Sequence, residues 1–354
     1  MNYRKTTIYS ETDASTAKTE PIDLELTDII SRLQVRFNII NASTATTNHP
    51  AKIASKVEIV DGSDVLWSLT GQEIEAMDFY DTDKPRAYEL DYRGFWPMQL
   101  ILNLNFGRFL YDPLLAFDCK KFTNPQLKVT HNKALGGSNP GSMQLQVIAD
   151  VFDDKVPTPR GFLTSREFYS FNNAAAAYKT IDMPKDYVLR KMLVRSQYYP
   201  NSFTDQIDDI RIDENNLKKI PVDLNMFHYM GSILNRHPMY MEHCVFSGAE
   251  CGGTIYITPC EYPAVALNPH AALTGYITDE YGGGKLLLTS VGSAVYRSLV
   301  TGWLPHACLP VEFGDQQNIE DWYDIRKIED LNLRLHTVSG NGTVEVILQQ
   351  LRPY

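Results

Sequence analysis

The sequence predicts an all-β protein built from two tandem β-sandwiches, and three observations support this prediction. Its 354 residues leave room for two domains, each with a core of its own. The balance of 44% hydrophobic and 21% charged residues is typical of a folded globular chain. Runs rich in Val, Ile, Leu and aromatic residues alternate with turn-forming Gly, Pro, Asn and Asp, and the order of these runs in the first half returns in the second.

Residues 1–24 predict a flexible N-terminal arm. They are rich in Thr, Ser, Glu and Lys with only scattered apolar positions, so we do not expect them to fold without a partner. They contain no apolar stretch of signal-peptide length, and no later run reaches the roughly 20 apolar residues that a membrane span requires. We therefore expect a protein that is made in the cytoplasm and stays soluble.

Residues 25–155 predict the first sandwich. Polar and apolar residues alternate over 32–37, which is the pattern of a half-buried strand. Within 71–84, apolar residues fall near helical spacing and predict one short helix among the strands. Two prolines then predict a linker over 156–165. The expected strands are 27–40, 51–62, 64–71, 95–106, 125–132 and 143–154, the last two forming an antiparallel hairpin.

Residues 166–354 predict a second sandwich of the same topology, because four segments correspond in order to segments of the first. Asp61 and Asp213 thereby fall at equivalent turns. The differences in length between the halves fall in loops, where insertions are tolerated. The run Ala174–Ala177 is assigned to neither a helix nor a strand. The matched segments are 188–201 with 30–41, 205–216 with 52–64, 218–234 with 65–80, and 329–354 with 125–152.

Eight-stranded sandwiches with Greek-key connections are jelly rolls. The order of segments over residues 25–354 resembles the double jelly-roll major capsid proteins of tailless icosahedral viruses, the lineage typified by PRD1 and adenovirus. The segments that carry the resemblance are LQVRFNII, VEIVDGSDVLWSLTGQEI, PTPRG and the repeated closing hairpin. None of them is a catalytic signature, so the resemblance lies in their order.

This resemblance implies a structural protein of the virion, synthesised in the host cytoplasm, and not an enzyme. It implies a homotrimer whose six upright sandwiches form a pseudo-hexagonal tile. The expected partners are other copies of the chain, neighbouring trimers, and penton and minor capsid proteins, with an internal membrane beneath the shell as a further candidate. Sequence-specific binding of nucleic acid is not expected, because the net charge is -10.

The stretch from His237 to Gly284 exceeds what sandwich hairpins normally need, and loops of that length are usually functional. By resemblance to the family, it forms a tower on the outer surface or locks one subunit to the next. The alternative is an ordinary set of strands with short loops. The N-terminal arm, by the same resemblance, lies at the inner face of the shell.

No metal, cofactor or catalytic site is expected from the sequence. His228, His237 and His243 lie near Cys244 and Cys251, but no C-x-x-C or H-x-x-x-H spacing frames a zinc site. The five cysteines are an odd number without a paired motif, which predicts reduced structural thiols and no disulfide framework. They are Cys119, Cys244, Cys251, Cys260 and Cys308.

Two further motifs are weak. The run from Gly282 to Lys285 lacks the first Gly and the Ser or Thr of a phosphate-binding loop, so a turn is expected. The acidic loop 312–330 could supply a calcium site or a glycosidase pair, although a solvated surface is the usual explanation. The carboxylates considered for such a site are Glu312, Asp315, Glu320, Asp321 and Asp324. A double-sandwich carbohydrate-active or amidase-like hydrolase and a receptor-binding spike remain the alternatives.

Overall fold

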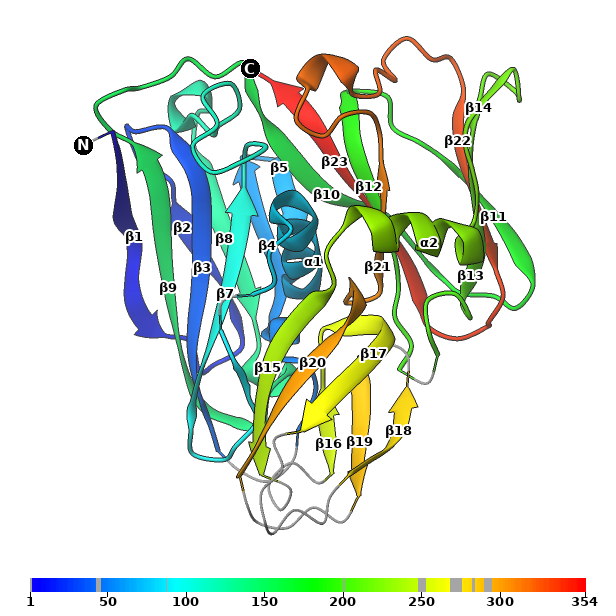
Figure 1. Cartoon of the computed structure of the whole chain (residues 1–354). Coiled ribbons are helices and arrows are strands. Elements are labelled where there is room, and N and C mark those ends of the chain that lie inside the picture. Colours follow the sequence, from blue (N-terminus) through cyan, green and yellow to red (C-terminus); the bar gives the residue numbers. More distant parts are fainter. Residues whose placement is uncertain are drawn as a thin grey trace.

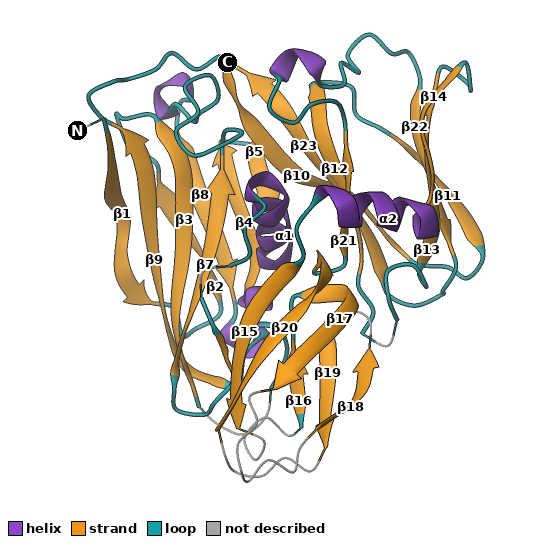
Figure 2. Cartoon of the chain, viewed as in Figure 1, coloured by secondary structure: helices purple, strands orange, loops and turns teal. Residues whose placement is uncertain are grey.

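The computed structural model describes residues 2–42, 46–86, 88–199, 201–247, 253–267, 276–281, 284–289 and 295–354. Strands dominate this part of the chain, as predicted, and its α-helices are α1 (Gly71–Thr82) and α2 (Met226–Arg236) (Figure 2). Neither helix is long and apolar enough to cross a membrane. Short 3₁₀ turns occur at Pro50–Ile53, Cys119–Lys121, Lys133–Leu135 and Ile319–Asp321.

The first sandwich consists of two four-stranded layers, and the chain crosses between them after each strand except between β4 and β5, which form a hairpin within one layer. One layer has the order β1 (Tyr3–Asp13), β9 (Pro140–Phe152), β3 (Ile30–Asn41) and β7 (Pro97–Asn105). The other has the order β2 (Lys18–Asp23), β8 (Pro125–His131), β4 (Ala54–Asp61) and β5 (Asp64–Leu69). Side chains from both layers share one core cluster. This strand order is that of a jelly roll.

The second sandwich repeats the order of the first, which confirms the predicted internal repeat. One layer has the order β10 (Gly161–Asn172), β23 (Thr343–Pro353), β12 (Val188–Ser196) and β21 (Cys308–Glu312). The other has the order β11 (Ala177–Asp182), β22 (Leu331–Thr337), β13 (Ile207–Glu214) and β14 (Lys219–Asn225). A second core cluster lies between them. The strands matched in the sequence therefore occupy equivalent places.

The two sandwiches stand side by side and share a sheet (Figure 1). β5 of the first pairs in parallel with β10 of the second at Ser68 and Arg166. This contact joins a layer of each sandwich into one eight-stranded sheet of the order β2-β8-β4-β5-β10-β23-β12-β21.

The predicted short helix is confirmed as α1, which directly follows β5. Thr70 caps it with a capping box, because its hydroxyl accepts from the Glu73 amide while the Glu73 carboxylate accepts from the Thr70 amide. α2 follows β14 at the equivalent point of the second sandwich, with Asn225 before its first residue. Each helix thus follows the fifth strand of its own jelly roll.

A strand-rich insertion follows α2, so the prediction of a long loop over residues 237–284 is wrong, and the described residues there fit the alternative of strands joined by loops. It runs from β15 (Tyr240–Ser247) to β20 (Val295–Pro305) and lies at the end of the molecule opposite both termini (Figure 1). One sheet joins β17 (Pro259–Leu267), β20, β15 and the two-residue β6 (Leu90–Asp91). The other joins β16 (Thr254–Tyr256), β19 (Lys285–Thr289) and β18 (Tyr276–Tyr281). The insertion has a core cluster of its own.

The prediction of a flexible arm over residues 1–24 is also wrong. β1 pairs with β9 along its length, and β2 pairs with β8. β1 is an edge strand whose Thr, Ser, Glu and Lys side chains largely face solvent, so its composition is similar to that of a disordered tail. Ile22 and Leu24 are buried in the core, and Ile8 packs against it. A strand that packs against the core with one face only needs apolar residues on that face alone.

The connection between the sandwiches is shorter than predicted. β9 ends at Phe152 and β10 begins at Gly161, so the second half of the expected linker 156–165 is already strand. Gly161 is required there, because a Cβ at this position would lie 2.2 Å from the carbonyl oxygen of Arg352. Ala174 to Ala176 form the turn before β11, which begins at Ala177.

Candidate functional site: a charged junction and an open sheet face

α1 lies between the two jelly rolls and covers the outer side of the layer β10-β23-β12-β21 (Figure 1). That layer is therefore buried on both sides. On the inner side, Met192 and Val194 of β12 belong to the second core cluster. On the outer side, Leu193 of β12, Ile347 of β23 and Cys308 of β21 belong to the first cluster, which includes the apolar residues of α1. The junction between the jelly rolls is thus part of the hydrophobic core.

Buried charges occupy one end of this junction. Asp81 at the end of α1 lies 2.6 Å from Nη1 of Arg190 and 3.1 Å from Nζ of Lys191. Gln349 of β23 donates to the other Asp81 oxygen at 2.9 Å. The side chains of Asp81, Arg190 and Lys191 are almost wholly buried. Each carboxylate oxygen is satisfied, which is the condition for placing an ion pair inside a protein.

Glu312 extends this charged group toward α2. Its carboxylate lies 3.5 Å from Lys191, 2.8 Å from Arg236 and 3.6 Å from the ring of His237. Burial would raise the pKa of Glu312, but the hydrogen bond from His237 and the charges of Lys191 and Arg236 lower it to about 2. His237 also lies 2.9 Å from Asp83, beyond the end of α1. These contacts tie both helices to one strand end.

The other end of the junction centres on Arg195 of β12. Its guanidinium donates to Gln72 of α1 at 2.7 Å, to the carbonyl of His306 at 3.1 Å and to the carboxylate of Glu345. Burial would lower the pKa of Arg195, but Glu345 outweighs it and raises the pKa. Arg195 therefore connects the start of α1 to two strands of the second jelly roll and to the end of the insertion.

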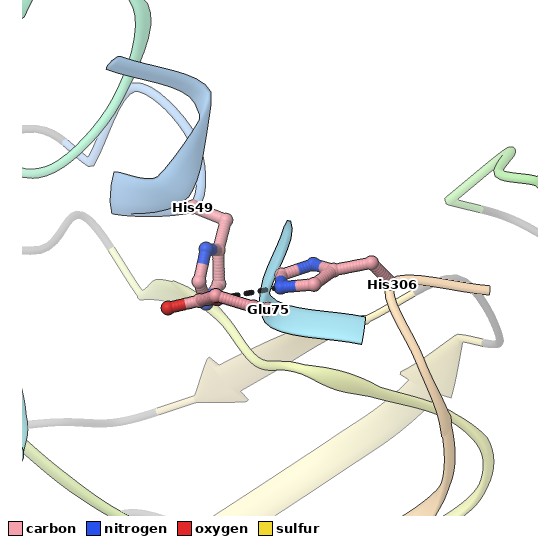
Figure 3. A group of neighbouring side chains, drawn as sticks. All are labelled: His49, Glu75 and His306. Carbon is pink, nitrogen blue, oxygen red and sulfur yellow. Dashed lines mark hydrogen bonds and ion pairs between the residues drawn. The ribbon is translucent and has the colours of Figure 1, made fainter. Parts of the chain in front are cut away.

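His49, Glu75 and His306 form a buried cluster between the first jelly roll and the insertion (Figure 3). Nε2 of His306 donates to Glu75 at 2.7 Å, and Nδ1 of the same ring accepts from Gln72 at 3.1 Å. Burial lowers the pKa of His306 to about 4, and burial together with the charge of Arg86 lowers that of His49 well below its usual value. Both rings are therefore neutral near pH 7.

Arg86 supplies the positive charge of this cluster. Its Nη2 lies 3.1 Å from Glu75, 3.4 Å from Glu242 and 3.1 Å from Nε2 of His49. Burial would raise the pKa of Glu75, but Arg86 and the hydrogen bond from His306 lower it to about 2. Glu242 accepts from the backbone and hydroxyl of Thr258, which ties the insertion to the same guanidinium.

Metal binding was considered for this cluster, because the ligating atoms of the three residues in Figure 3 lie within 4.8 Å of one another. It is the one such group among the described residues. The guanidinium of Arg86 already lies within hydrogen-bonding distance of Glu75 and His49. A divalent ion would have to displace a buried cation that neutralises Glu75, so the residues do not fit a metal site.

On the outer side of the layer β1-β9-β3-β7, α1 contacts only the β7 edge, where Asn103 and Asn105 donate to Asp78 at 2.8 and 2.7 Å, and no helix of the described residues covers β3 and β9. Arg32, Gln34 and Arg36 of β3 point to this side, and Arg32 pairs with Asp150 of β9 at 2.8 Å. A cavity of about 670 Å³ lies over these side chains and reaches the end of α1. Exposed apolar side chains, Phe109 and Leu110, line it as well. This open sheet face therefore carries a hollow that the described residues do not fill.

The structure does not bring the histidines and cysteines considered for zinc together. His228 and His243 are exposed, His237 bonds to Asp83, and Cys244 is buried in the core of the insertion. Cys251 lies outside the described residues. Cys119, Cys244, Cys260 and Cys308 are free and buried, as expected of structural thiols.

The carboxylates of the acidic loop 312–330 have separate roles in the structure. Glu312 belongs to the junction, Glu320 pairs with Arg160 at 3.3 Å, and Asp324 pairs with Arg326 at 2.7 Å. The side chain of Asp321 accepts from the backbone of Asp315 at 2.6 Å. In the phosphate-loop-like run, Gly282 and Gly283 lie outside the described residues, and Lys285 begins β19.

Sequence reasoning missed the residues of the junction. One signal was available: Arg190 and Lys191 stand next to each other inside an otherwise apolar strand, where simple alternation allows only one of them to face solvent. Both are buried because a bulge between Leu189 and Lys191 shifts the register against β23. Glu75, His49 and His306 lie far apart in the sequence, and no local pattern links them.

Together, the two eight-stranded sandwiches, the shared sheet and the helix after each fifth strand define a double jelly roll. Solved structures of viral capsid proteins have the same fold. The chain is similar to the MCP of STIV, the Sulfolobus Turreted Icosahedral Virus, with 10% identity, a TM-score of 0.64, and coverage of 100% of this chain and 98% of that one.

Two further solved structures extend this likeness. The major capsid protein P2 from Bacteriophage PM2 matches with 11% identity and a TM-score of 0.57, covering 99% of this chain and 98% of that one. The Faustovirus major capsid protein matches with 8% identity and a TM-score of 0.52, covering 99% and 89%. No protein-family model and no curated protein matches the sequence. The likeness therefore rests on the fold, which agrees with the one predicted.

Proposed function

We propose that this chain is the major structural protein of an icosahedral virus shell and that it acts by self-assembly, without catalysis. The observation that carries the proposal is the double jelly roll itself, which fills the chain from β1 to β23 and matches capsid proteins over nearly their full length. The buried charged residues of the junction are paired with one another, as in Asp81 with Arg190 and Glu75 with Arg86, which supports a role in holding the units of the chain together.

We infer a homotrimer with a pseudo-hexagonal outline. Each chain carries two similar upright units side by side, so three chains in a ring present six similar units. Such a trimer can meet neighbouring trimers through similar sides, which supports tiling of a shell. Assembly with neighbouring trimers, with a penton protein and with minor proteins belongs to this proposal.

The orientation in the shell follows from the two ends of the molecule. Both termini lie at one end and the insertion β15–β20 lies at the other (Figure 1). We infer that the insertion forms an outer tower and that the terminal end faces the interior, where a minor protein or a membrane would lie. The support is the position of the insertion alone.

The test is the mass and outline of the purified chain. Light scattering should give three times the chain mass of 40.2 kDa at micromolar concentration, and negative-stain electron microscopy should show hexagonal tiles or closed shells. A single-chain mass over that whole concentration range, with no shells under crowding conditions, would contradict the proposal.

A further inference from the structure

α1 and α2 occupy the same place in their jelly rolls, so they can be compared position by position. Each begins directly after the fifth strand of its sandwich. Their first helical residues are Gly71 and Met226. This alignment pairs Gln72 with Phe227, Ala76 with Gly231, and Tyr80 with Asn235.

In α1, the face formed by these residues is buried against the second jelly roll. Gln72 accepts from Arg195, and the hydroxyl of Tyr80 donates to the carbonyl of Cys308 at 2.8 Å. Ala76 has no exposed surface. The face is thus the surface through which one jelly roll holds the next.

In α2, the equivalent face is exposed. Phe227 is 73% exposed, and Gly231 and Asn235 are exposed as well. The opposite face of α2 is buried, because Met226, Met230 and Ile233 belong to the second core cluster. α2 therefore presents an aromatic ring on a side that has no partner among the described residues.

Gly231 supports the same conclusion independently. It lies in the middle of α2, where glycine is the least favourable residue after proline. A Cβ at this position would meet none of the described atoms within 4 Å, so none of them requires glycine there. The equivalent residue of α1 is the small Ala76 at a close helix–sheet contact. A small residue at 231 suits the same close approach.

The surface that α1 covers has a counterpart in the first jelly roll. β3 corresponds to β12, β9 to β23 and β7 to β21, and the pairing registers agree. Three outward-facing rows, each crossing three strands, can be matched between the two faces. The row Arg32, Asp150 and Asn105 corresponds to Lys191, Gln349 and Glu312. The rows Gln34, Ile148, Asn103 and Arg36, Gln146, Ile101 correspond to Leu193, Ile347, Pro310 and Arg195, Glu345, Cys308.

This counterpart is the open sheet face with the cavity of about 670 Å³. Arg36 occupies the place of Arg195, but its Nε is buried without a hydrogen-bond partner among the described residues. Arg195, in contrast, is fully bonded to Gln72 and Glu345. An arginine with an unused donor beneath an open hollow points to a group that arrives from outside.

We propose that α2 of one copy packs on the β3-β9-β7 face of a second copy, as α1 packs on the β12-β23-β21 face within the chain. Phe227 then lies against the guanidinium of Arg36, a cation–π contact, and Gly231 allows the helix to approach the sheet. Between copies, this contact joins two different surfaces of the chain, the α2 face and the sheet face. Such a head-to-tail contact can close into a ring of copies. α2 and β9 lie on opposite sides of the molecule, so one chain cannot make it with itself (Figure 1).

This inference rests on the proposed trimer and names the residues that form it. In such a ring, three contacts through α1 within chains alternate with three contacts through α2 between chains. The six jelly rolls are then held by six similar helix–sheet contacts.

The first experiment changes α2 only. Gly231→Gln adds a long side chain where a Cβ meets none of the described atoms, so the single chain should be no less stable, and its melting temperature by circular dichroism should not fall. Its trimer dissociation constant, measured by analytical ultracentrifugation, should rise at least tenfold. Gly231→Ala is the matched control and should leave the constant unchanged, because alanine occupies the equivalent place in α1.

Phe227→Ala gives a second measurement that only removes exposed atoms, and it should also weaken the trimer about tenfold. Leu217→Ala is its control, because Leu217 is an exposed apolar residue in the turn between β13 and β14. A wild-type trimer that neither Gly231→Gln nor Phe227→Ala weakens would overturn the inference and leave the proposed function standing. A wild-type chain that stays single would overturn both.

A charge swap tests the pairing directly. Arg36→Glu and Phe227→Lys should each weaken the trimer at least tenfold, because each removes the cation–π contact. The double variant Arg36→Glu/Phe227→Lys should recover most of the loss, since a carboxylate and an ammonium then face each other between copies. Losses that simply add in the double variant would show that Arg36 and Phe227 do not meet.

Discussion

The helices α1 and α2 follow equivalent strands, yet the more polar one is the more deeply buried. α1 carries Gln72, Glu73, Glu75, Asp78 and Asp81 and is buried along most of its length. α2 is richer in Met, Ile, Leu and aromatic residues, and only three of its residues are buried. The difference teaches that the burial of these helices depends on whether a neighbouring element offers matching polar and apolar partners, and not on how polar the helix is. Each of these polar side chains of α1 has at least one hydrogen-bond partner within the chain, whereas one face of α2 meets no partner element among the described residues.

The largest effect is expected from Asp81→Ala, which breaks the charged end of the α1 junction. It leaves Arg190 and Lys191 buried beside each other with one carboxylate fewer. Removing one member of a buried ion pair typically costs about 3–5 kcal/mol, and we expect the free energy of unfolding to fall by about that amount. Urea titration followed by circular dichroism measures it.

Asp324→Ala is the control for that variant. Asp324 pairs with Arg326 on the surface, where both side chains are substantially exposed. Exposed pairs typically contribute about 0–1 kcal/mol, so the loss should stay below that limit. Equal losses in the two variants would show that the junction is open to water and would remove the contrast between α1 and α2.

The pH dependence sharpens the comparison, because His306 bonds to two residues of α1 and His228 stands exposed on α2. The pKa of His306 is about 4 in the fold and near its usual value in the unfolded chain. Between pH 4 and pH 6.5 the His306 ring is therefore protonated in the unfolded chain and neutral in the folded one. The stabilisation by neutral His306 is thus complete above about pH 6.5 and is lost as the pH falls toward 4, by at most about 1.4 kcal/mol per pH unit.

His306→Asn should therefore flatten the loss of stability between pH 6.5 and 4 relative to the wild type. His228→Asn should leave the slope unchanged. Urea titrations at several pH values in this window give both slopes, and carboxylates such as Asp78, whose pKa burial raises to about 6, cancel in the difference between variant and wild type. A wild-type slope retained in His306→Asn would mean that water reaches the ring in the native state.

A smaller loss is expected from Gly71→Ala at the start of α1. A Cβ at Gly71 would lie 2.2 Å from the carbonyl oxygen of Ala51 and 3.1 Å from the Ala54 Cβ. Backbone atoms cannot move aside cheaply, so we expect a loss of about 1–3 kcal/mol, typical of overpacking. Thermal melting monitors it. An unchanged melting temperature would show that the contact between α1 and the turn at Pro50–Ile53 is loose.

Much of this fold could be predicted from the sequence, because a half-buried strand leaves a period-two pattern. Segments such as 30–41 and 188–196 carry that pattern, and their order identified two sandwiches. β1 escaped detection, since an edge strand that packs on one side needs few apolar residues and has the composition of a tail. The insertion was seen as a loop because its strands are short and depend on contacts such as β6 with β15.

The junction could not be predicted, since its residues are linked only through the folded backbone. Asp81 and Arg190 are 109 positions apart, and Glu75 and His306 are 231 apart. The polar residues of α1 are typical of a solvent-exposed helix when they are considered alone. Phe227 is the opposite case, because it is an apolar residue on the exposed side of a helix. Its position can be recognised as unusual once α1 and α2 are aligned.

The smallest expected effect separates the two reasons for which Gly231 could be a glycine. In the single chain, Gly231→Ala should raise the free energy of unfolding by about 0.5–1 kcal/mol, because alanine is the better helix former and its Cβ meets open space. If a close contact between copies sets the size of this residue, the trimer should tolerate alanine, as the α1 junction tolerates Ala76, and should reject glutamine. If both variants stabilise the chain and assemble equally well, α2 is not the helix that joins the copies, and the open face of the first jelly roll must be covered by something else.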